Sequence, residues 1–284
     1  MQSYKLRKDF PFFKNEKIIY LDSAATSQKP QVVLDAMDDY YNNYCANIHR
    51  GSHEMGNLAT KKYEEAREYI ADFIGADSRE LVFTRNTTEG INLVAECFVK
   101  NRYKTVILSE LEHHSNIVPW QLQGLDIKVI KMDKDLNIDL KDFEELLQKN
   151  SNSFVALTHV SNSFGIINPI KKLIELAHKY CCKVLIDGAQ AVAHLNVDVK
   201  DLDADFYLFS AHKVYGPTGV GALYGKYENL YDMKPYQGGG SMIKEVSFDK
   251  SSFLEPPHKF EAGTQAIAEV IGFKEALRYL KEIK

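Results

Sequence analysis

Short apolar segments alternate with amphipathic segments along most of the chain. Apolar runs rich in β-branched and aromatic residues predict strands near residues 17–22, 81–84, 105–110, 127–132, 154–160, 183–188, 205–210 and 219–225. Apolar residues at helical spacing predict helices over residues 59–75, 88–100, 139–149, 169–180 and 266–284. The stretch 238–263 has weak periodicity and many Gly, Ser and Pro residues, which predicts a long loop.

The alternation of strand and helix indicates the fold class. Parallel neighbouring strands need crossover connections, and these are usually helices. We therefore predict a three-layer α/β fold, with a mostly parallel sheet and helices on both faces. No internal repeat or flexible linker divides the 284 residues, so we expect one continuous domain. Ligands of such sheets gather at the carboxyl ends of the strands.

Composition argues against several classes of binding partner, namely nucleic acid and membranes. The 35 Lys and Arg residues against 39 Asp and Glu residues give a net charge of −4, which offers no broad cationic surface for nucleic acid or anionic lipid. No segment has the apolar length of a signal peptide or membrane span, so we expect a soluble cytoplasmic protein. The cysteines, Cys45, Cys97, Cys181 and Cys182, have neither metal-ligand nor disulfide-framework spacing, and none is placed for catalysis.

A lysine and an aspartate each stand at the end of a predicted strand. Lys213 lies in SAHK, and a lysine desolvated there has the lowered pKa that an amine nucleophile needs, although most lysines are solvated on the surface. Asp187 lies in LIDGAQ, where a carboxylate could keep a pyridine nitrogen protonated in pyridoxal chemistry. A helix N-cap is the alternative for Asp187. Gln190 could bind the phenolate oxygen of the same ring.

The segment NTTEGIN predicts a site for a phosphate group. Thr87 and Thr88 follow a predicted strand and begin a helix, where backbone N–H groups and the helix dipole favour an anion. A plain capping box is the competing interpretation. Ser210 and His212 flank the lysine and could donate hydrogen bonds to the same phosphate.

Two further polar residues follow predicted strands. His113, in EHHSN, could stack on a pyridine ring and transfer protons. A metal site built on the His113–His114 pair is the alternative, but no HxH, HExxH or Cys–His spacing accompanies the pair, so we predict no metal. Asn162, in HVSNSFG, has an amide suited to a substrate carboxylate or the ring oxygen, although asparagine is also common in turns.

Nine segments in order resemble the successive motifs of the class V aminotransferase family, a group of fold-type-I pyridoxal 5′-phosphate enzymes. The likeness is closest to the Suf-type cysteine desulfurases and selenocysteine lyases, and it runs from about Tyr20 to the end of the chain. The segments are YLDSAATSQKP, HRGSH, FTRNTTEGINLVA, EHHSNIVPWQ, HVSNSFG, IDGAQ, SAHKVYGPTGVGALYG, GGGSMI and FEAGT.

The resemblance implies a role for each matched residue. Lys213 would carry the cofactor as a Schiff base, Asp187 would pair with the pyridinium, and Gln190 would contact the phenolate oxygen. His113 would stack on the ring. The remaining matches are Thr87, Thr88, Ser210 and His212 for the phosphate; Thr264 for the phosphate of a neighbouring subunit in a homodimer; Asn162 for the substrate carboxylate; Ala24 and Ala25 near the substrate amine; and His49 and Arg50 in an active-site loop.

The implied activity is that of a cysteine desulfurase. Such an enzyme converts L-cysteine to L-alanine and passes the sulfur through an enzyme persulfide to iron–sulfur cluster assembly or another sulfur-acceptor protein. A selenocysteine lyase or another class V activity is the alternative among enzymes. A non-catalytic remnant that binds the cofactor or dimerises is the alternative of another class. A nucleotide-binding dehydrogenase is disfavoured because no GxGxxG follows the first predicted strand.

The resemblance also assigns residues 1–284 to the cofactor-binding large domain with its N-terminal arm, without the family's small C-terminal domain. That domain carries the mobile-loop cysteine and an arginine for the substrate carboxylate. If the chain ends at Lys284, we expect an inactive or incomplete desulfurase; if it belongs to a longer product, we expect the full reaction. Asn86 and Gln265 depart from the family pattern, which often has glycine and proline at these positions.

Overall fold

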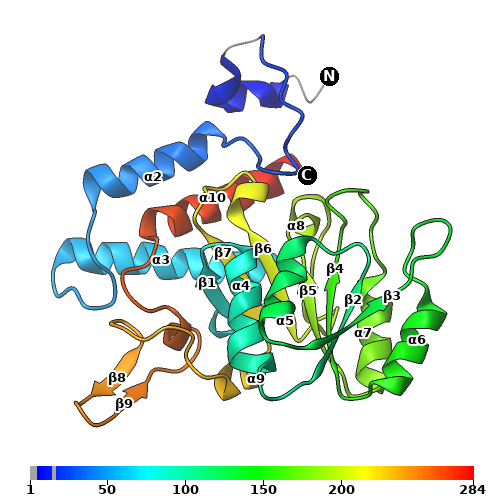
Figure 1. Cartoon of the computed structure of the whole chain (residues 1–284). Coiled ribbons are helices and arrows are strands. Elements are labelled where there is room, and N and C mark those ends of the chain that lie inside the picture. Colours follow the sequence, from blue (N-terminus) through cyan, green and yellow to red (C-terminus); the bar gives the residue numbers. More distant parts are fainter. Residues whose placement is uncertain (1–4, 15–16) are drawn as a thin grey trace.

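The computed structural model describes residues 5–14 and 17–284, and its centre is a seven-stranded sheet (Figure 1). The strands are β1 (Leu81–Thr84), β2 (Thr105–Ser109), β3 (Asp126–Ile130), β4 (Phe154–Thr158), β5 (Lys183–Asp187), β6 (Phe206–Ser210) and β7 (Gly221–Gly225). Their order in the sheet is β1-β7-β6-β5-β4-β2-β3. Strands β3, β2, β4, β5 and β6 pair in parallel, whereas β7 is antiparallel to both β1 and β6. The predicted mostly parallel sheet is confirmed.

Helices connect most of these strands. The α-helices are α2 (Gln31–Asn43), α3 (Glu54–Phe73), α4 (Thr87–Val94), α5 (Val118–Leu122), α6 (Leu140–Lys149), α7 (Ile170–Lys179), α8 (Ala191–His194), α9 (Tyr227–Asp232) and α10 (Ile267–Ile283). A π-helical segment, η4 (Ala95–Val99), continues α4, and the 3₁₀ segments are η1 (Arg7–Asp9), η2 (Pro11–Lys14), η3 (Ser78–Glu80), η5 (His114–Asn116), η6 (Ala211–Lys213) and η7 (His258–Phe260). In the described part of the chain, no helix is both long and apolar enough to cross a bilayer.

Alternating strand residues build one apolar core on each face of the sheet. In β5, Val184 and Ile186 face a core that contains residues of α3, α6, α7 and α10. Leu185 faces the opposite core, which contains residues of α4, α5 and α9. Successive side chains of a strand point to opposite faces, so a sheet covered on both sides reads as a continuous apolar run. The three predicted layers follow from this burial.

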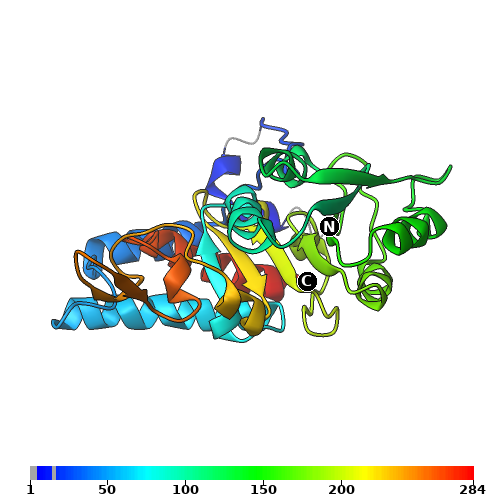
Figure 2. The ribbon, with the colours of Figure 1, turned by 60° about the horizontal axis from the view of Figure 1, so that its bottom comes forward.

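Helices from both ends of the chain pack together at one side of the sheet. Figures 1 and 2 both place α2, α3 and α10 beside one another, and α10 contacts both of the other helices. The contact with α2 is close at Gly272, where an added Cβ would lie 2.9 Å from Cγ of Met37. The C-terminal helix therefore belongs to the same folded body as the N-terminal segment.

Three sequence-based predictions need correction. The predicted strand at 17–22 does not form; Ile19 and Leu21 are exposed there, and the segment has no partner strand in the sheet. The predicted loop at 238–263 contains a hairpin of β8 (Ile243–Val246) and β9 (Ser251–Phe253), which lies apart from the main sheet. Helix α2, which was not predicted, begins directly after Pro30. The strand at 17–22 fails because no neighbouring strand pairs with it, which local pattern does not show, whereas β8 and β9 pair with each other across a short turn.

A buried ion pair joins α3, β1 and the segment that follows η7. Arg67 and Glu261 are both buried and form two hydrogen bonds, Nη1 to Oε1 and Nη2 to Oε2, each of 2.7 Å. Glu261 also accepts the backbone N–H of Phe83 at 2.8 Å, and Arg67 donates to the carbonyl of Leu81 at 2.9 Å. Every charge and most polar groups at this junction are therefore compensated.

Replacing Glu261 by glutamine should destabilise the fold strongly, because the buried Arg67 guanidinium would lose its bidentate carboxylate and keep only the half-buried Glu64 as an ion-pair partner. We expect a loss of about 3 kcal/mol in the free energy of unfolding, measured by urea denaturation. The matched control is Glu145→Gln, because Glu145 pairs with Lys149 on the exposed surface of α6 and should leave the unfolding midpoint unchanged. Equal urea unfolding midpoints for Glu261→Gln and Glu145→Gln would contradict the stabilising role of the Arg67–Glu261 pair.

Candidate active site

The carboxyl ends of neighbouring strands open onto one cavity of about 480 Å³. Strand register sets this arrangement, because Thr158 at the end of β4 pairs with Asp187 at the end of β5, and β5 pairs with β6. The cavity brings together most of the predicted site residues. Those that line it are Ala24, Ala25, Thr87, Thr88, His113, Asn162, Asp187, Gln190, Ser210, His212 and Lys213.

Lys213 and Asp187 lie in this cavity and influence one another electrostatically. Burial lowers the pKa of the Lys213 amine, and the Asp187 charge opposes that shift. Burial raises the pKa of the Asp187 carboxyl, opposed by a 2.9 Å hydrogen bond from the Ala189 N–H and by the Lys213 charge. The cavity therefore holds an amine that loses its proton more readily than a surface lysine, together with a buried carboxylate.

The first turn of α4 forms the hydroxyl-rich end of the cavity. Asn86 caps the helix, since its side chain accepts the N–H of Glu89 at 2.9 Å. Thr87 donates its N–H to Oγ of Ser210 at 2.9 Å, and the two hydroxyl oxygens lie 2.8 Å apart. Capping and the predicted anion site are therefore compatible, because Asn86 caps the helix while the hydroxyls of Thr87 and Ser210 line the cavity.

A glycine lets this helix start approach the lysine strand. Gly221 of β7 pairs with Ser210 on one side and with Thr84 on the other. A Cβ at Gly221 would lie 2.9 Å from both Cα of Asn86 and the carbonyl oxygen of Phe209. Any larger residue would push the Asn86 turn away from β6, and thus separate the Thr87 and Ser210 hydroxyls.

His113 borders the cavity at the start of η5. Burial, then the neighbouring His114 and Lys213, lower the pKa of its imidazole, so the ring is neutral at pH 7. The rings of His113 and His114 are tilted by 35°, with centroids 3.8 Å apart. A neutral ring can both accept and donate a proton, as the predicted acid-base role requires.

Sequence reasoning missed Glu112, which fixes the position of the His113 segment. Its two carboxylate oxygens accept hydrogen bonds from the Ser109 hydroxyl (2.5 Å), the Thr158 N–H (3.0 Å) and the Asn116 amide (2.6 Å). Burial raises the pKa of Glu112 to about 7, against these hydrogen bonds. The carboxylate thus joins the ends of β2 and β4 to η5. The sequence signal for this role was a glutamate that stands directly before His113 and shortly after a predicted strand.

The N-terminal arm covers the cavity through contacts with the lysine segment. Ser27, also missed from sequence, donates both its N–H (2.8 Å) and its hydroxyl (2.9 Å) to the carbonyl of His212. Gln190 donates its amide to the carbonyl of Ala24 at 2.7 Å. One hydrogen of that amide remains for a ligand. These contacts hold Ala24 and Ala25 at the cavity wall.

Three predicted residues lie outside this cavity. Thr264 lines a separate cavity of about 570 Å³. His49 pairs with Glu64 beside α3, and Arg50 is exposed. The role predicted for Thr264 involves a second copy of the chain, so it stays a prediction, as do the substrate roles of His49 and Arg50.

The lined cavity supports a defined range of chemistry. It combines an amine of lowered pKa, a buried carboxylate, neutral imidazoles and a hydroxyl-rich helix start, which together suit an anionic aromatic cofactor and a small substrate. The pKa of His212 falls to about 4, mainly because of burial. Among the described residues, no cysteine lines the cavity, and the four thiols form no disulfide.

Comparisons with known proteins identify the family of this chain. A family model described as aminotransferase class-V matches residues 19–284. A protein of Mycolicibacterium paratuberculosis named "Probable cysteine desulfurase" is 47% identical over 290 residues, covering 98% of this chain and 42% of that protein. A "Cysteine desulfurase" of Synechococcus elongatus is 44% identical over 292 residues, covering 99% of this chain and 46% of that protein. The chain thus spans less than half the length of these curated relatives.

A solved structure extends the likeness to three dimensions. The apo structure of a cysteine desulfurase from Thermococcus onnurineus NA1 superposes with a TM-score of 0.93 at 42% sequence identity. The match covers 99% of this chain and 71% of that one. Sequence and fold agree, and the chain belongs to the class V aminotransferase family.

Proposed function

We propose that this chain forms the pyridoxal phosphate-binding part of a cysteine desulfurase. The observation that carries the proposal is the presence of Lys213 and Asp187 in one cavity, beside the hydroxyls of Thr87 and Ser210. The names of the relatives that match nearly the whole chain support the same activity.

The residues of the cavity fit pyridoxal phosphate by their chemistry. A phosphate needs hydrogen-bond donors, and the hydroxyls of Thr87, Thr88 and Ser210 line the cavity at the start of α4, where the helix dipole favours an anion. A pyridinium nitrogen needs an anionic partner, and Asp187 is buried with one oxygen already oriented by the Ala189 N–H. The volume of about 480 Å³ suits a cofactor of this size together with a small amino acid.

The bound cofactor would serve as an electron sink that weakens bonds at the α and β carbons of an amino acid. Asp187 would hold a proton on the ring nitrogen, because a buried carboxylate stabilises a neighbouring cation. Gln190 would donate its free amide hydrogen to the ring oxygen. Thr87, Thr88, Ser210 and His212 would hold the phosphate.

Lys213 and His113 would handle protons on the substrate side. The Lys213 amine would attach the cofactor covalently and then, when released, carry a proton between the substrate α and β carbons. His113, neutral at pH 7, would lie over the ring and transfer protons near the sulfur. Asn162 in its exposed turn would bind the substrate carboxylate, next to Ala24 and Ala25.

The sulfur would leave on a thiol that approaches the cavity, because no described cysteine lines it. The thiolate attacks the substrate sulfur, the carbon–sulfur bond breaks, and protonation of the β carbon gives alanine and a persulfide. A second thiol then reduces the persulfide to sulfide and a disulfide. A homodimer, with Thr264 reaching the cofactor phosphate of the partner subunit, belongs to the same proposal. So do an active-site loop with His49 and Arg50 and the delivery of sulfur to iron–sulfur cluster assembly.

The first test is the absorption spectrum of the chain purified with pyridoxal phosphate. We expect a violet-absorbing band that Lys213→Ala abolishes, because the covalent link needs that amine. With L-cysteine and excess dithiothreitol, the same preparation should form alanine and sulfide. The matched control is Lys172→Ala, an exposed lysine of α7, which should keep both the band and the products. A normal band in Lys213→Ala would refute the assignment.

Asp187→Asn tests the electron-sink role. An amide cannot neutralise a pyridinium, so we expect weaker cofactor retention and a loss of turnover of at least about 100-fold, as removal of a charge-stabilising group produces. Equilibrium dialysis measures retention, and alanine formation at saturating cofactor measures turnover. Wild-type turnover in this variant would exclude the role.

The lowered pKa of Lys213 predicts how cofactor capture depends on pH. The neutral amine is the reactive form, so the rate of band formation should rise with pH, with a midpoint below the ordinary lysine pKa of 10.5. Asp187 raises the pKa of Lys213, so Asp187→Asn should move the midpoint to still lower pH. Stopped-flow absorbance at several pH values measures both. A midpoint that moves upward in the variant would contradict the predicted interaction.

A further inference from the structure

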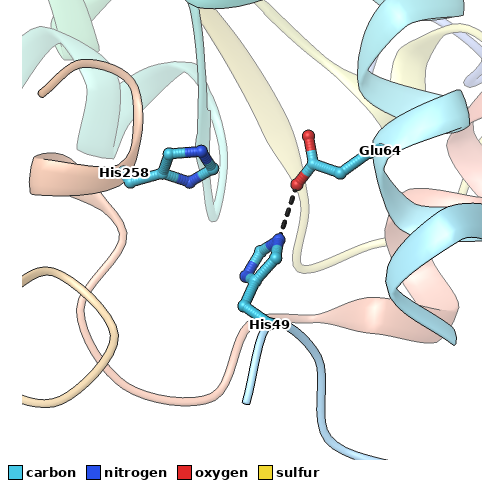
Figure 3. Close-up of side chains that lie close together, drawn as sticks. All are labelled: His49, Glu64 and His258. Carbon is cyan, nitrogen blue, oxygen red and sulfur yellow. Dashed lines mark hydrogen bonds and ion pairs between the residues drawn. The ribbon is translucent and has the colours of Figure 1, made fainter. Parts of the chain in front are cut away.

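Three metal-binding side chains from distant parts of the sequence meet beside α3. They are His49, which precedes α3, Glu64 within it, and His258 in η7, and one ligand atom of each lies within 4.8 Å of the others. Figure 3 shows both imidazole rings and the carboxylate around a shared space. Nε2 of His49 lies 2.7 Å from Oε1 of Glu64, and the two histidine rings have centroids 5.3 Å apart.

We propose that His49, Glu64 and His258 bind one divalent transition-metal ion of the Zn²⁺ class. Two imidazole nitrogens and one carboxylate oxygen form a donor set that Zn²⁺ prefers, and water completes four-fold coordination. Zn–ligand bonds of about 2.0–2.1 Å place tetrahedral ligand atoms about 3.3 Å apart. Small side-chain rotations would bring the cluster from its present spread of 4.8 Å to that spacing. The ion would take the place of the hydrogen bond between His49 and Glu64.

The carboxylate of Glu64 is oriented for this role. Arg67 donates from Nε to Oε2 of Glu64 at 2.9 Å, which leaves Oε1 directed at the histidines. Arg67 thus pairs with two carboxylates, through its Nη atoms with Glu261 and through Nε with Oε2 of Glu64, and Oε1 of Glu64 is the oxygen that faces a cation. A hydrogen-bonded group behind a ligand is typical of protein metal sites.

The backbone holds His49 in an unusual conformation at this place. Its φ is 64°, in the left-handed region that residues other than glycine seldom adopt. Its N–H donates to Oγ1 of Thr60 at 2.9 Å, which fixes the residue against α3. Strained backbone is often found where a side chain has a specific task.

The metal would connect three segments of the fold away from the lysine cavity. None of its ligands lines that cavity. The ion would join the loop before α3 to η7, close in sequence to Glu261 and Thr264. The sequence-based prediction of no metal rested on local spacings, whereas His49 and His258 come from opposite ends of the chain.

Metal titration of the purified chain, freed of metal by chelation, tests this inference. With Zn²⁺ in a calorimeter we expect one ion per chain. With Co²⁺ we expect visible bands of four-coordinate geometry, without the charge-transfer band of a thiolate ligand. Glu64→Gln and His258→Ala should each weaken Zn²⁺ binding by at least about tenfold. His194→Ala, which removes an exposed histidine outside the cluster, is the matched control and should bind as the parent does.

Unfolding temperatures without metal check that each variant folds, and His258→Gln replaces His258→Ala if the latter does not fold. The proposal is overturned if the cluster variants bind Zn²⁺ as tightly as the unmodified chain, or if the chain binds no Zn²⁺. A thiolate charge-transfer band would also overturn it, because it would locate the ion at a cysteine. The violet band with pyridoxal phosphate should persist in these variants. Only Lys213→Ala should lose this band, so failure of the metal proposal can be told apart from failure of the proposed function.

Discussion

The parallel pairing of β4, β5 and β6 is the constraint on which the site depends. Each strand is buried on both faces, so its polar chemistry can appear only where the strand ends. Thr158, Asp187 and Ser210 are those ends; strand register pairs Thr158 with Asp187 and Asp187 with Leu208, so Ser210 lies two residues further along β6. A slip of one residue in β5 would turn Asp187 to the opposite face of the sheet.

Much of this arrangement could be predicted from sequence because the signals are local. Continuous apolar runs mark the strands from 81 to 225, and a polar residue directly after such a run falls at the ligand edge of a parallel sheet. Lys213, Asp187 and His113 were found in this way. The family motifs added Ala24 and Ala25, whose small side chains carry no chemical signal of their own.

The features that sequence did not reveal arise from contacts between distant residues. Glu112 stands in the same motif as His113 and bonds Ser109 and Asn116 nearby in sequence, but its contact with the Thr158 N–H, which ties the motif to β4, forms only when the sheet folds. The apolar run at 17–22 has the composition of a strand yet finds no neighbour to pair with. Composition indicates the secondary structure that a segment favours, but a strand forms only where a neighbouring strand can pair with it.

The bonds from Ser27 to His212 span 185 residues of chain. During synthesis the arm leaves the ribosome before β6 and the lysine segment, so it can dock only after these segments have been made. The wall formed by Ala24 and Ala25 is consequently assembled late, after the strands it covers. A ribosome-bound chain that stops short of residue 213 has neither the amine nor the wall, so the cavity belongs to the completed sheet rather than to the growing chain.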